Sequence, residues 1–427
     1  MLHLRRLGML GSLALLAALC TLNARAEDNK GEIKTVFVIA MENHNWTQPA
    51  NQFSGGIQQI FQNPNAPFIN ALVNGTATAT INGRQVNISK HVAFATNYHN
   101  VLATAGVNPH IHPSEPNYIW AEAGSNFGVF NDNDPFAPAG TNLQISNVDN
   151  QLHLTRLLDQ CGVSWKSYQE DIDLVPNGTS FDNVVLPQNL WTSPIKSLSG
   201  NFVNGVNQFN GSTQFNYAVK HNPQAYFTDS NGGNDLTTAN PKRLQYAPLQ
   251  QFFVDLSNNA VAQYNWITPN QFNDQHTALK GGFKGVTGDA ANILQGDFFL
   301  QQVIPVIMAS KAYNDHGAIV IWWDEAEGDG VAGDNPDDLN HTIGEIVISP
   351  EAHPNEGGVP FGSDVFLTHS SDLRTMQEIF HVTRPFFLGD AIHGSDLSSL
   401  FAEGAIPQRN GNGNDDGRGC GGDRGDR

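Results

Sequence analysis

The sequence predicts an α/β fold with a mainly parallel central sheet that helices cover on both faces. Short apolar runs have the composition of buried strands, and they lie at residues 36–40, 318–323 and 343–348. Two further strand-like runs, each with one polar face, lie at residues 163–168 and 264–268. Helical patterns lie at residues 151–160, about 290–313 and 371–380. Because strands that alternate with helices form parallel sheets covered on both sides, this order favours that fold class.

The N-terminal residues have the pattern of a secretory signal peptide. Arg5 and Arg6 precede an apolar run at residues 9–19, and Ala24-Arg25-Ala26 is a small-x-small cleavage site. The run is too short to span a bilayer comfortably, and no later segment is long and apolar enough to do so. We therefore expect residues 1–26 to be removed after Ala26, a periplasmic or secreted protein, and no stable membrane insertion.

Length and charge limit the classes of partner. The chain has 427 residues with 40% hydrophobic content, which is enough for one large domain or two closely joined ones. The formal net charge is −19, and loss of three arginines with the signal peptide brings it to about −22. Such a surface repels nucleic acids and anionic membranes, so no nucleic-acid partner is expected. Acid clusters in an exported protein suit divalent cations, whereas the sequence leaves the oligomeric state open.

Three other features concern organisation. Residues 27–408 form the expected main domain, within which residues 176–214 are the least patterned part and are expected to be an insertion or cap. Residues 409–427 are rich in Gly, Asp and Arg without apolar periodicity, so a disordered tail is expected. Cys161 and Cys420 remain after export, and a disulfide between them and two unpaired thiols are equally open.

Polar side chains follow the predicted strands directly. Glu42 and Asn43 come after the run at residues 36–40, and Asp324 and Glu325 come after the run at residues 318–323. The loop after residues 264–268 carries Asp274 and His276. His341 precedes the run at residues 343–348, which fits an antiparallel strand or a loop that returns to the same edge. Because ligands of such sheets bind beyond the carboxyl ends of the strands, these groups should converge at one edge.

The residue types at this edge favour a metal site. A carboxylate such as Glu42 at the end of a buried strand is costly unless it is paired or binds a cation. Asp324 and Glu325 repel each other, and a cation relieves that repulsion. Helix capping is the alternative for each pair, and it would be preferred for an isolated pair. Two such strand ends in one chain shift the interpretation towards a metal.

Ser114 is the candidate nucleophile. It stands in His112-Pro113-Ser114-Glu115-Pro116-Asn117-Tyr118 before an apolar turn, which predicts a helix that begins at the serine. Amide groups at a helix start favour a bound phosphate. His110 and His112 flank the serine and are candidate acids for the leaving group, although ordinary polar loop residues are an equal alternative. The chain lacks a G-x-x-x-x-G-K-[ST] loop, a G-x-S-x-G elbow and an H-E-x-x-H pair, which disfavours P-loop, α/β-hydrolase and zincin chemistry.

Together these motifs resemble the bacterial phosphoesterase family of acid phosphatases and phospholipases C, within the alkaline phosphatase superfamily. The stretches that carry the resemblance occur in the family's order and cover nearly all the mature chain, at residues 36–43, 112–118, 164–168, 221–223, 226–227, 267–270, 273–276, 323–325, 369–371 and 374–375. After the first strand this chain reads Glu-Asn-His-Asn-Trp-Thr, which is closer to the acid phosphatase branch than the Glu-Asn-Arg-Ser-Phe-Asp-His-Tyr of the phospholipase C branch.

The resemblance implies an alkaline-phosphatase-like fold with loop-rich insertions and a role for each matched residue. Ser114 would be the nucleophile, forming a phosphoserine, and a metal ligand. The other implied metal ligands are Glu42, Asn43, Asp324 and Glu325. Asp274, His276 and His341 correspond to a second cluster that holds a second metal or, with Asn43, the phosphate. His276 or His341 would protonate the leaving group or activate water.

The spacing of Asp274 and His276 is tighter than the two-zinc pattern, so one divalent cation is favoured over two. The sequence thus predicts an exported, metal-dependent phosphomonoesterase that acts on a small phosphate ester. The alternatives are a phospholipase C-like phosphodiesterase and a non-catalytic exported protein that binds a cation with the same fold.

Overall fold

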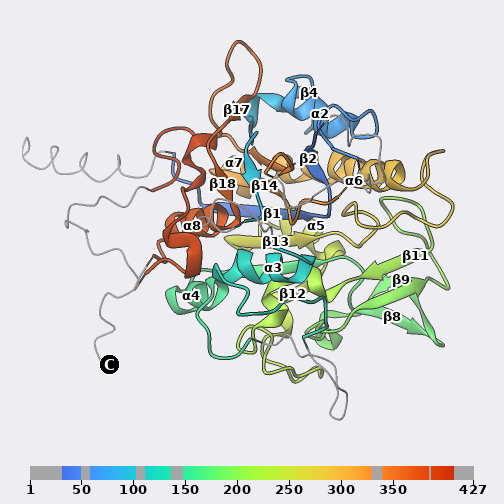
Figure 1. The fold of residues 1–427 in the computed structure, drawn as a ribbon. Coiled ribbons are helices and arrows are strands. Elements are labelled where there is room, and N and C mark those ends of the chain that lie inside the picture. The colour runs from blue at the N-terminus through green and yellow to red at the C-terminus, as the bar shows by residue number, and fades with distance from the viewer. Residues whose placement is uncertain are drawn as a thin grey trace, which may run out of the picture.

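An eight-stranded sheet lies at the centre of the structure, a computed structural model that describes residues 31–49, 58–101, 111–135, 148–328, 339–383 and 386–407 (Figure 1). The strand order is β12-β7-β13-β1-β14-β16-β5-β17. The bounds of these strands, in chain order, are β1 Thr35–Met41, β5 Val92–Ala95, β7 Trp165–Gln169, β12 Tyr246–Pro248, β13 Tyr264–Thr268, β14 Gly317–Trp323, β16 Glu345–Ile348 and β17 Phe361–Ser363.

The helices and the smaller sheets surround this centre. The α-helices are α2 Pro67–Val73, α3 Ser114–Ala123, α4 Leu154–Cys161, α5 Leu249–Ser257, α6 Asp289–Ala309, α7 Lys311–Asn314 and α8 His369–Ile379. Short 3₁₀ turns are η1 Ile88–His91, η2 Gln188–Leu190, η3 Val219–His221, η4 Pro223–Tyr226, η5 Arg243–Gln245, η6 Gly389–Ile392 and η7 Leu397–Leu400. The paired outer strands are β2 Asn45–Thr47 with β15 Thr342–Ile343, β6 Tyr98–His99 with β18 Leu367–Thr368, β3 Thr78–Ile81 with β4 Arg84–Asn87, β8 Leu174–Asn177 with β9 Ser180–Val185, and β10 Leu198–Asn201 with β11 Gln214–Tyr217.

The predicted fold class is confirmed. β12, β7, β13, β1 and β14 run parallel, and β16 is the antiparallel strand between β14 and β5. The antiparallel direction of β16 settles the choice that the sequence left open for the strand after His341. It brings the start of β16 to the edge where β14 ends, because Glu345 pairs with Trp322.

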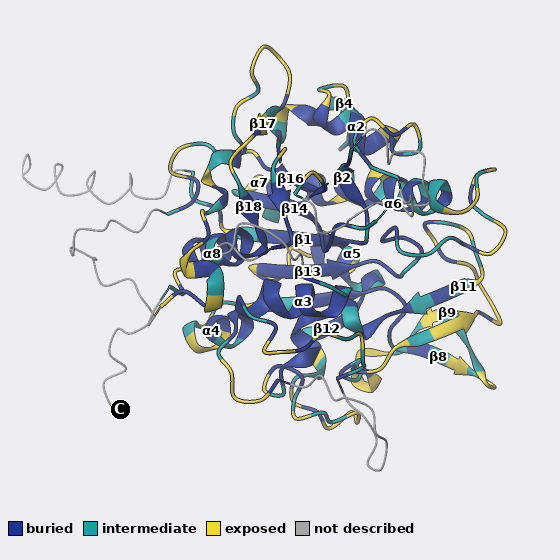
Figure 2. Ribbon diagram, in the orientation of Figure 1, coloured by how far each residue is buried: buried dark blue, intermediate teal, exposed yellow. Residues whose placement is uncertain are grey.

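Both faces of the sheet are buried under helices, as the dark strands of Figure 2 show. On one face, Phe37 of β1 contacts Phe252 of α5, with ring centroids 6.0 Å apart. On the other face, Trp266 and Trp322 meet the Tyr118 ring of α3 at 5.9 and 5.1 Å. This double coverage explains why β1 and β14 consist of apolar residues without alternation.

Two predicted elements are divided in the structure. The apolar run at residues 343–348 forms β15 and β16 on either side of Gly344, where a Cβ atom would collide with the Trp323 ring. The helix expected at about 290–313 ends at Ala309, and Ser310 begins α7 as its N-cap, accepting a hydrogen bond from the Tyr313 N–H. Serine is favoured at this position because its side-chain oxygen can accept a hydrogen bond from a backbone N–H of the first turn.

The region at residues 176–214 contains most of two antiparallel strand pairs, β8–β9 and β10–β11. It contacts the loops after β7 and β13, because the Asn207 Nδ2 donates to Glu170 Oε1 at 2.5 Å and the Asn210 Nδ2 donates to Asn273 Oδ1 at 2.9 Å. Cys161 is disulfide-bonded. Cys420, residues 1–26 and the tail at 409–427 lie outside the described residues. Among the helices that are described, none combines the length and apolar character needed to cross a bilayer.

A buried histidine joins α3, α4 and the segment after η4. His153 is the N-cap residue of α4 and is fully buried, with its ring stacked on Phe227 at a centroid distance of 4.0 Å. Its Nδ1 lies 3.0 Å from Glu122 Oε1, and its Nε2 lies 2.8 Å from Asp229 Oδ1. Burial alone would lower the pKa of His153, but the hydrogen bonds to Asp229 and Glu122 outweigh it and raise the pKa.

This raised pKa makes the stability contribution of His153 depend on pH. The contribution is fully present below the unfolded pKa of about 6.5 and is lost as the pH rises through the higher folded pKa. We expect the difference in unfolding free energy between wild type and His153→Gln to be larger at about pH 5.5 than at about pH 8. Denaturant unfolding at both pH values measures it, with the exposed His381→Gln as control. An equal difference at both pH values would contradict the interpretation.

Candidate functional site

The candidate site lies at the carboxyl ends of β1, β13 and β14. Glu42 follows β1, Asp274 lies in the loop after β13, and Asp324 follows β14. The backbone links these three loops, because the Glu42 N–H donates to the Asp274 carbonyl at 2.8 Å and the Asp324 N–H donates to the Met41 carbonyl at 3.3 Å. These hydrogen bonds fix the loops relative to the sheet, and the side chains of the loops are positioned with them.

Ser114 is the first residue of α3 and is 1% exposed. Three oxygens from other segments surround its Oγ atom: Glu325 Oε1 at 3.1 Å, Glu42 Oε2 at 3.2 Å and Asn43 Oδ1 at 3.3 Å. The hydroxyl has one proton and can donate it to one of them. The other two then face the lone pairs of the serine oxygen, which is unfavourable unless a cation lies among these atoms.

Asn43 and Asp324 are oriented towards the same place. The Asn43 Nδ2 donates to Glu327 Oε1 at 3.1 Å, so the amide oxygen faces Ser114. The Asn43 backbone has a φ of 41°, a left-handed conformation that asparagine tolerates better than most residues. Asp324 Oδ1 accepts the Asn43 N–H at 2.9 Å, while Oδ2 is buried and has no hydrogen-bond donor among the described residues. An acceptor without a donor fits a metal ligand.

The electrostatics of the site also favour a bound cation. Burial raises the pKa of Asp324 well above its usual value, and the charge of Glu325 adds to the shift. Burial likewise raises the pKa of Glu42, with contributions from the charges of Asp324 and Asp274. These carboxylates destabilise one another when ionised in the protein alone. A divalent cation would lower their pKa values and turn the repulsion into attraction.

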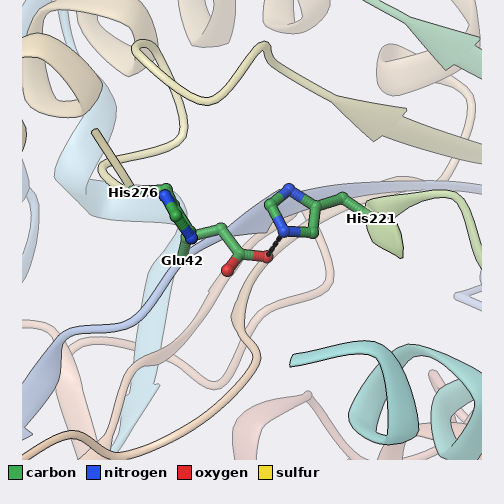
Figure 3. A group of neighbouring side chains, drawn as sticks. All are labelled: Glu42, His221 and His276. Carbon is green, nitrogen blue, oxygen red and sulfur yellow. Dashed lines mark ion pairs between the residues drawn. The ribbon is translucent and has the colours of Figure 1, made fainter. Parts of the chain in front are cut away.

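A second group of ligand atoms lies on the other side of Glu42. Glu42, His221 and His276 each offer one ligand atom, and these atoms lie within 4.8 Å of one another (Figure 3). His221 Nε2 lies 3.2 Å from Glu42 Oε1 without hydrogen-bond geometry, and its Nδ1 lies 3.2 Å from Asp274 Oδ2. Burial and the Lys220 charge lower the pKa of His276 to about 4. Burial also lowers the pKa of His221 well below its usual value. Both imidazoles are thus neutral near pH 7 and can accept a proton or bind a cation.

Tyr118 of α3 supports this second group. Its hydroxyl donates to Glu42 Oε1, and its ring is stacked on the His221 ring with centroids 5.2 Å apart. Glu42 therefore presents one oxygen to Ser114 and the other to Tyr118 and His221. Because one carboxylate contacts both groups of ligand atoms, the two groups form one site.

The remaining histidines that the sequence singled out lie in different places. His112 is half-buried, and its Nδ1 lies 2.7 Å from Glu325 Oε2. His110 lies outside the described residues. His341 is buried next to β15. Among the described residues, the group of three candidate metal ligands contains His276 and not His341.

Lys220 supplies positive charge to this acidic site. Its Nζ lies 3.0 Å from Asp132 Oδ2 and 3.5 Å from His276 Nε2. Burial alone would lower the pKa of Lys220, but the charges of Glu42 and Asp132 outweigh it and raise the pKa. The ammonium group therefore remains charged, and it can hold an anion beside His276.

A buried hydrogen-bond network holds the backbone carbonyl of Asp324 in place. The Trp322 indole donates to His369 Nδ1 at 2.9 Å, so the His369 proton lies on Nε2, which donates to the Asp324 carbonyl. The Tyr98 hydroxyl lies 2.8 Å from the same Nδ1 and donates to Asp372. Burial lowers the pKa of His369 to about 3, so the ring stays neutral and keeps this orientation.

Four residues of this arrangement had no role assigned from the sequence: Asp132, Tyr118, Lys220 and His221. His221 and Tyr118 stand within stretches that carry the family resemblance, and that was the one signal available for them. Lys220 and Asp132 lie in a 3₁₀ turn and a loop without periodicity, where neither spacing nor strand ends indicate a site.

Comparison with known proteins agrees with the resemblance. The sequence is 30% identical over 197 residues to a Kluyveromyces lactis protein described as "Probable acid phosphatase", a match that covers 46% of this chain and 37% of that protein. It is 31% identical over 196 residues to an acid phosphatase of Aspergillus fumigatus, covering 45% and 34%. The matched part is thus about a third of the length of these relatives. Both relatives are fungal, whereas the resemblance named a bacterial family.

Solved structures with a related arrangement include a protein of the alkaline phosphatase superfamily from Vibrio parahaemolyticus. It has a TM-score of 0.41 and 12% identity, covering 90% of this chain and 74% of that chain. The phosphonate monoester hydrolase of Agrobacterium radiobacter has a TM-score of 0.36 and 11% identity, covering 88% and 78%. Both scores are low, and the fold class rests on the strand order described above.

The model of one sequence family covers most of the chain. The description of that family is "Phosphoesterase family", and its match extends over residues 17–383, which include the segments that carry Glu42, Ser114, Asp274 and Asp324. The chain belongs to the phosphoesterase family.

Proposed function

We propose that this protein is an exported phosphomonoesterase of acid-phosphatase type that hydrolyses small phosphate esters with Ser114 as its nucleophile. The observation that carries the proposal is the convergence of Glu42 Oε2, Asn43 Oδ1 and Glu325 Oε1 on the Ser114 Oγ atom. Membership of the phosphoesterase family and the names of the fungal relatives support the same reaction class. The small-x-small site before residue 27 supports export.

One divalent cation fits the oxygen atoms around Ser114. Glu42, Asn43, Asp324 and Glu325 would hold it together with the serine, and such an oxygen set favours Mg²⁺, Mn²⁺ or Ca²⁺. When bound, the cation supplies Lewis-acid stabilisation of the serine oxygen and of the phosphoryl charge. We assign the group around His276 to the phosphate, because the Lys220 ammonium lies 3.5 Å from His276 Nε2 and would repel a second cation.

The side chains then divide the reaction between them. In the first step, the Ser114 hydroxyl releases its proton to water and its Oγ attacks phosphorus, the bond to the leaving oxygen breaks, and a phosphoserine forms. We propose that His112, half-buried beside Glu325, donates a proton to the leaving oxygen. Lys220 and the N-terminal amides of α3 hold the phosphoryl oxygens.

In the second step, water gives up a proton and attacks the phosphoserine, the bond between phosphorus and the Ser114 oxygen breaks, phosphate is released, and the serine oxygen takes a proton from water. His276 suits the role of base for this water, because its pKa of about 4 leaves it unprotonated near neutral pH. This proposal assigns no step to His341, because among the described residues the group of ligand atoms around Glu42 contains His276 and not His341.

The serine provides the first test. We expect Ser114→Ala to lower the turnover of p-nitrophenyl phosphate by on the order of 10³-fold or more, because covalent catalysis is lost. The circular dichroism spectrum and the midpoint of thermal unfolding should remain close to those of wild type. Ser257→Ala, in an exposed position at the end of α5, is the matched control and should keep full activity. Retained turnover in Ser114→Ala would refute the assignment of the nucleophile.

The cation gives a second test that does not depend on turnover. Chelator-treated protein should gain about 2.7 kcal/mol of unfolding free energy when Mn²⁺ is added at 100 times its dissociation constant. Asp324→Asn should be at least as stable as wild type without metal, because a repelling charge is removed, but should gain much less from Mn²⁺. Thermal unfolding with and without Mn²⁺ measures both effects. Equal gains in the two proteins would place the metal elsewhere.

The substrate class provides a third test. We expect faster turnover of p-nitrophenyl phosphate than of bis-p-nitrophenyl phosphate, and no release of phosphocholine from phosphatidylcholine vesicles. The reason is that Lys220 and the helix amides bind the free oxygens of a monoester, of which a diester has fewer. A preference for the diester or for the phospholipid would support the phosphodiesterase alternative, and no turnover of any of the three would support a non-catalytic cation-binding protein.

A further inference from the structure

Asp132 lies in the loop after α3 and uses both of its carboxylate oxygens inside the candidate site. Its Oδ1 accepts a hydrogen bond from the Glu115 backbone N–H at 3.1 Å, and its Oδ2 accepts one from Lys220 Nζ at 3.0 Å. Glu115 is the residue that follows Ser114 in α3. The carboxylate therefore links α3, the helix that begins at Ser114, to the ammonium group of Lys220.

These two donors are suited to a phosphoryl group. An amide at the start of a helix and a lysine ammonium both favour bound phosphate oxygens. Each donor is positioned by its own element, since Glu115 lies in the first turn of α3 and Lys220 lies in η3. The donor pair is therefore in place whichever anion occupies it.

The carboxylate of Asp132 adds a negative charge to a site that already contains several carboxylates. Burial raises the pKa of Glu325 well above its usual value, and the charges of Glu327 and Asp132 add to the shift. The acids Glu42, Asp274 and Asp324 lie within the field of the same lysine. The position of the Asp132 carboxylate thus depends on the two donors, and an anion of higher charge can compete for them.

The carboxylate can leave without displacing its loop. The Asp132 side chain is 36% exposed, so it has access to water. The backbone of the next residue is held by other contacts, because the Asn133 N–H donates to Asn131 Oδ1 at 2.9 Å and the Tyr226 hydroxyl donates to the Asn133 carbonyl at 3.3 Å. A change of the Asp132 rotamer would be enough to free both donors.

We propose that Asp132 acts as an internal stand-in for phosphate: its carboxylate occupies Lys220 Nζ and the Glu115 N–H in the free enzyme and yields them to a phosphoryl oxygen of the substrate. The inference rests on the proposed function and names the part of the site that binds the phosphoryl group. Because the carboxylate returns when phosphate dissociates, it weakens the binding of the product. Asp132 is thus a specificity-determining residue that sets the affinity of the site for phosphate.

Titration calorimetry of the full-length protein, loaded with Mn²⁺, tests the proposal with inorganic phosphate as the probe. Asp132→Asn should lower the dissociation constant of phosphate roughly tenfold, the factor expected if the carboxylate occupies the donors about nine-tenths of the time. Asp132→Ala should lower the dissociation constant by a similar factor, which would show that the asparagine amide itself does not cause the gain. Lys220→Met should weaken binding and should reduce the effect of Asp132→Asn when the two are combined.

Asp134→Asn is the matched control, because Asp134 lies in the same loop but bonds Ser197 at 2.8 Å through Oδ1. This variant should bind phosphate as wild type does. The proposal is overturned if Asp132→Asn and Asp132→Ala leave phosphate affinity unchanged or weaken it, or if neither variant binds phosphate. It is also overturned if Asp134→Asn gives the same gain, since the effect would then come from net charge.

Failure of the proposed role of Asp132 can be distinguished from failure of the proposed enzymatic function. The calorimetric gain requires no turnover, so it should also appear when Asp132→Asn is made in a Ser114→Ala background. A gain without any esterase activity would retain the phosphate site and reject the enzyme. Esterase activity without the gain would retain the enzyme and reject the role of Asp132.

Discussion

Mutual repulsion among buried carboxylates is the constraint on which the structure around the site depends. Glu42, Asp274 and Asp324 are fully buried, and Glu325 is nearly so. An ionised carboxylate without compensation costs several kcal/mol at such depth. The protein compensates with the partly buried Lys220 ammonium, with backbone N–H groups such as that of Asn43, and with the neutral ring of His221 between two acids. The proposed divalent cation would complete this compensation, and the acidic residues, which are unfavourable in the protein alone, would then give the site its affinity for the cation.

The sheet makes this arrangement possible because it holds three acidic loops close together. β1 lies between β13 and β14, and hydrogen bonds join the loop backbones just beyond the strands. The helix α3 then brings Ser114 to the same edge, with Tyr118 one turn later against Glu42. Glu42 contacts Ser114 through one oxygen and His221 through the other. A substitution there would alter metal affinity and phosphate binding together, whereas changes at Asp132 or His276 should affect one of them.

The sequence predicted the central strands and the acids that follow them because both signals are local. An apolar run marks a buried strand, and the next polar residue marks its end, which was sufficient for Glu42, Asn43, Asp324 and Glu325. Lys220 and Asp132 reach the site from an irregular turn and a loop. Neither position is marked in the sequence by an apolar run or by the end of a strand. For His341 the adjacency to a strand indicated the right edge, but Gly344 divides that strand, and β15 pairs with β2 instead of continuing the central sheet. The locations of Lys220, Asp132 and His341 thus depend on tertiary contacts, which the local sequence does not reveal.

The position of β1 in the sheet also has a consequence for the order in which the molecule can form. Its neighbours β13 and β14 come from the second half of the chain, and the contact between Asn43 and Asp324 joins residues 281 positions apart. Contacts of such sequence separation form slowly, because the entropy of closing long loops is lost before any pairing energy is gained. A chain still being synthesised therefore carries an apolar first strand without its partners, and the acidic site cannot form until β14 and Glu325 have been made. The proposed metal site would therefore form only after all of these segments have been synthesised.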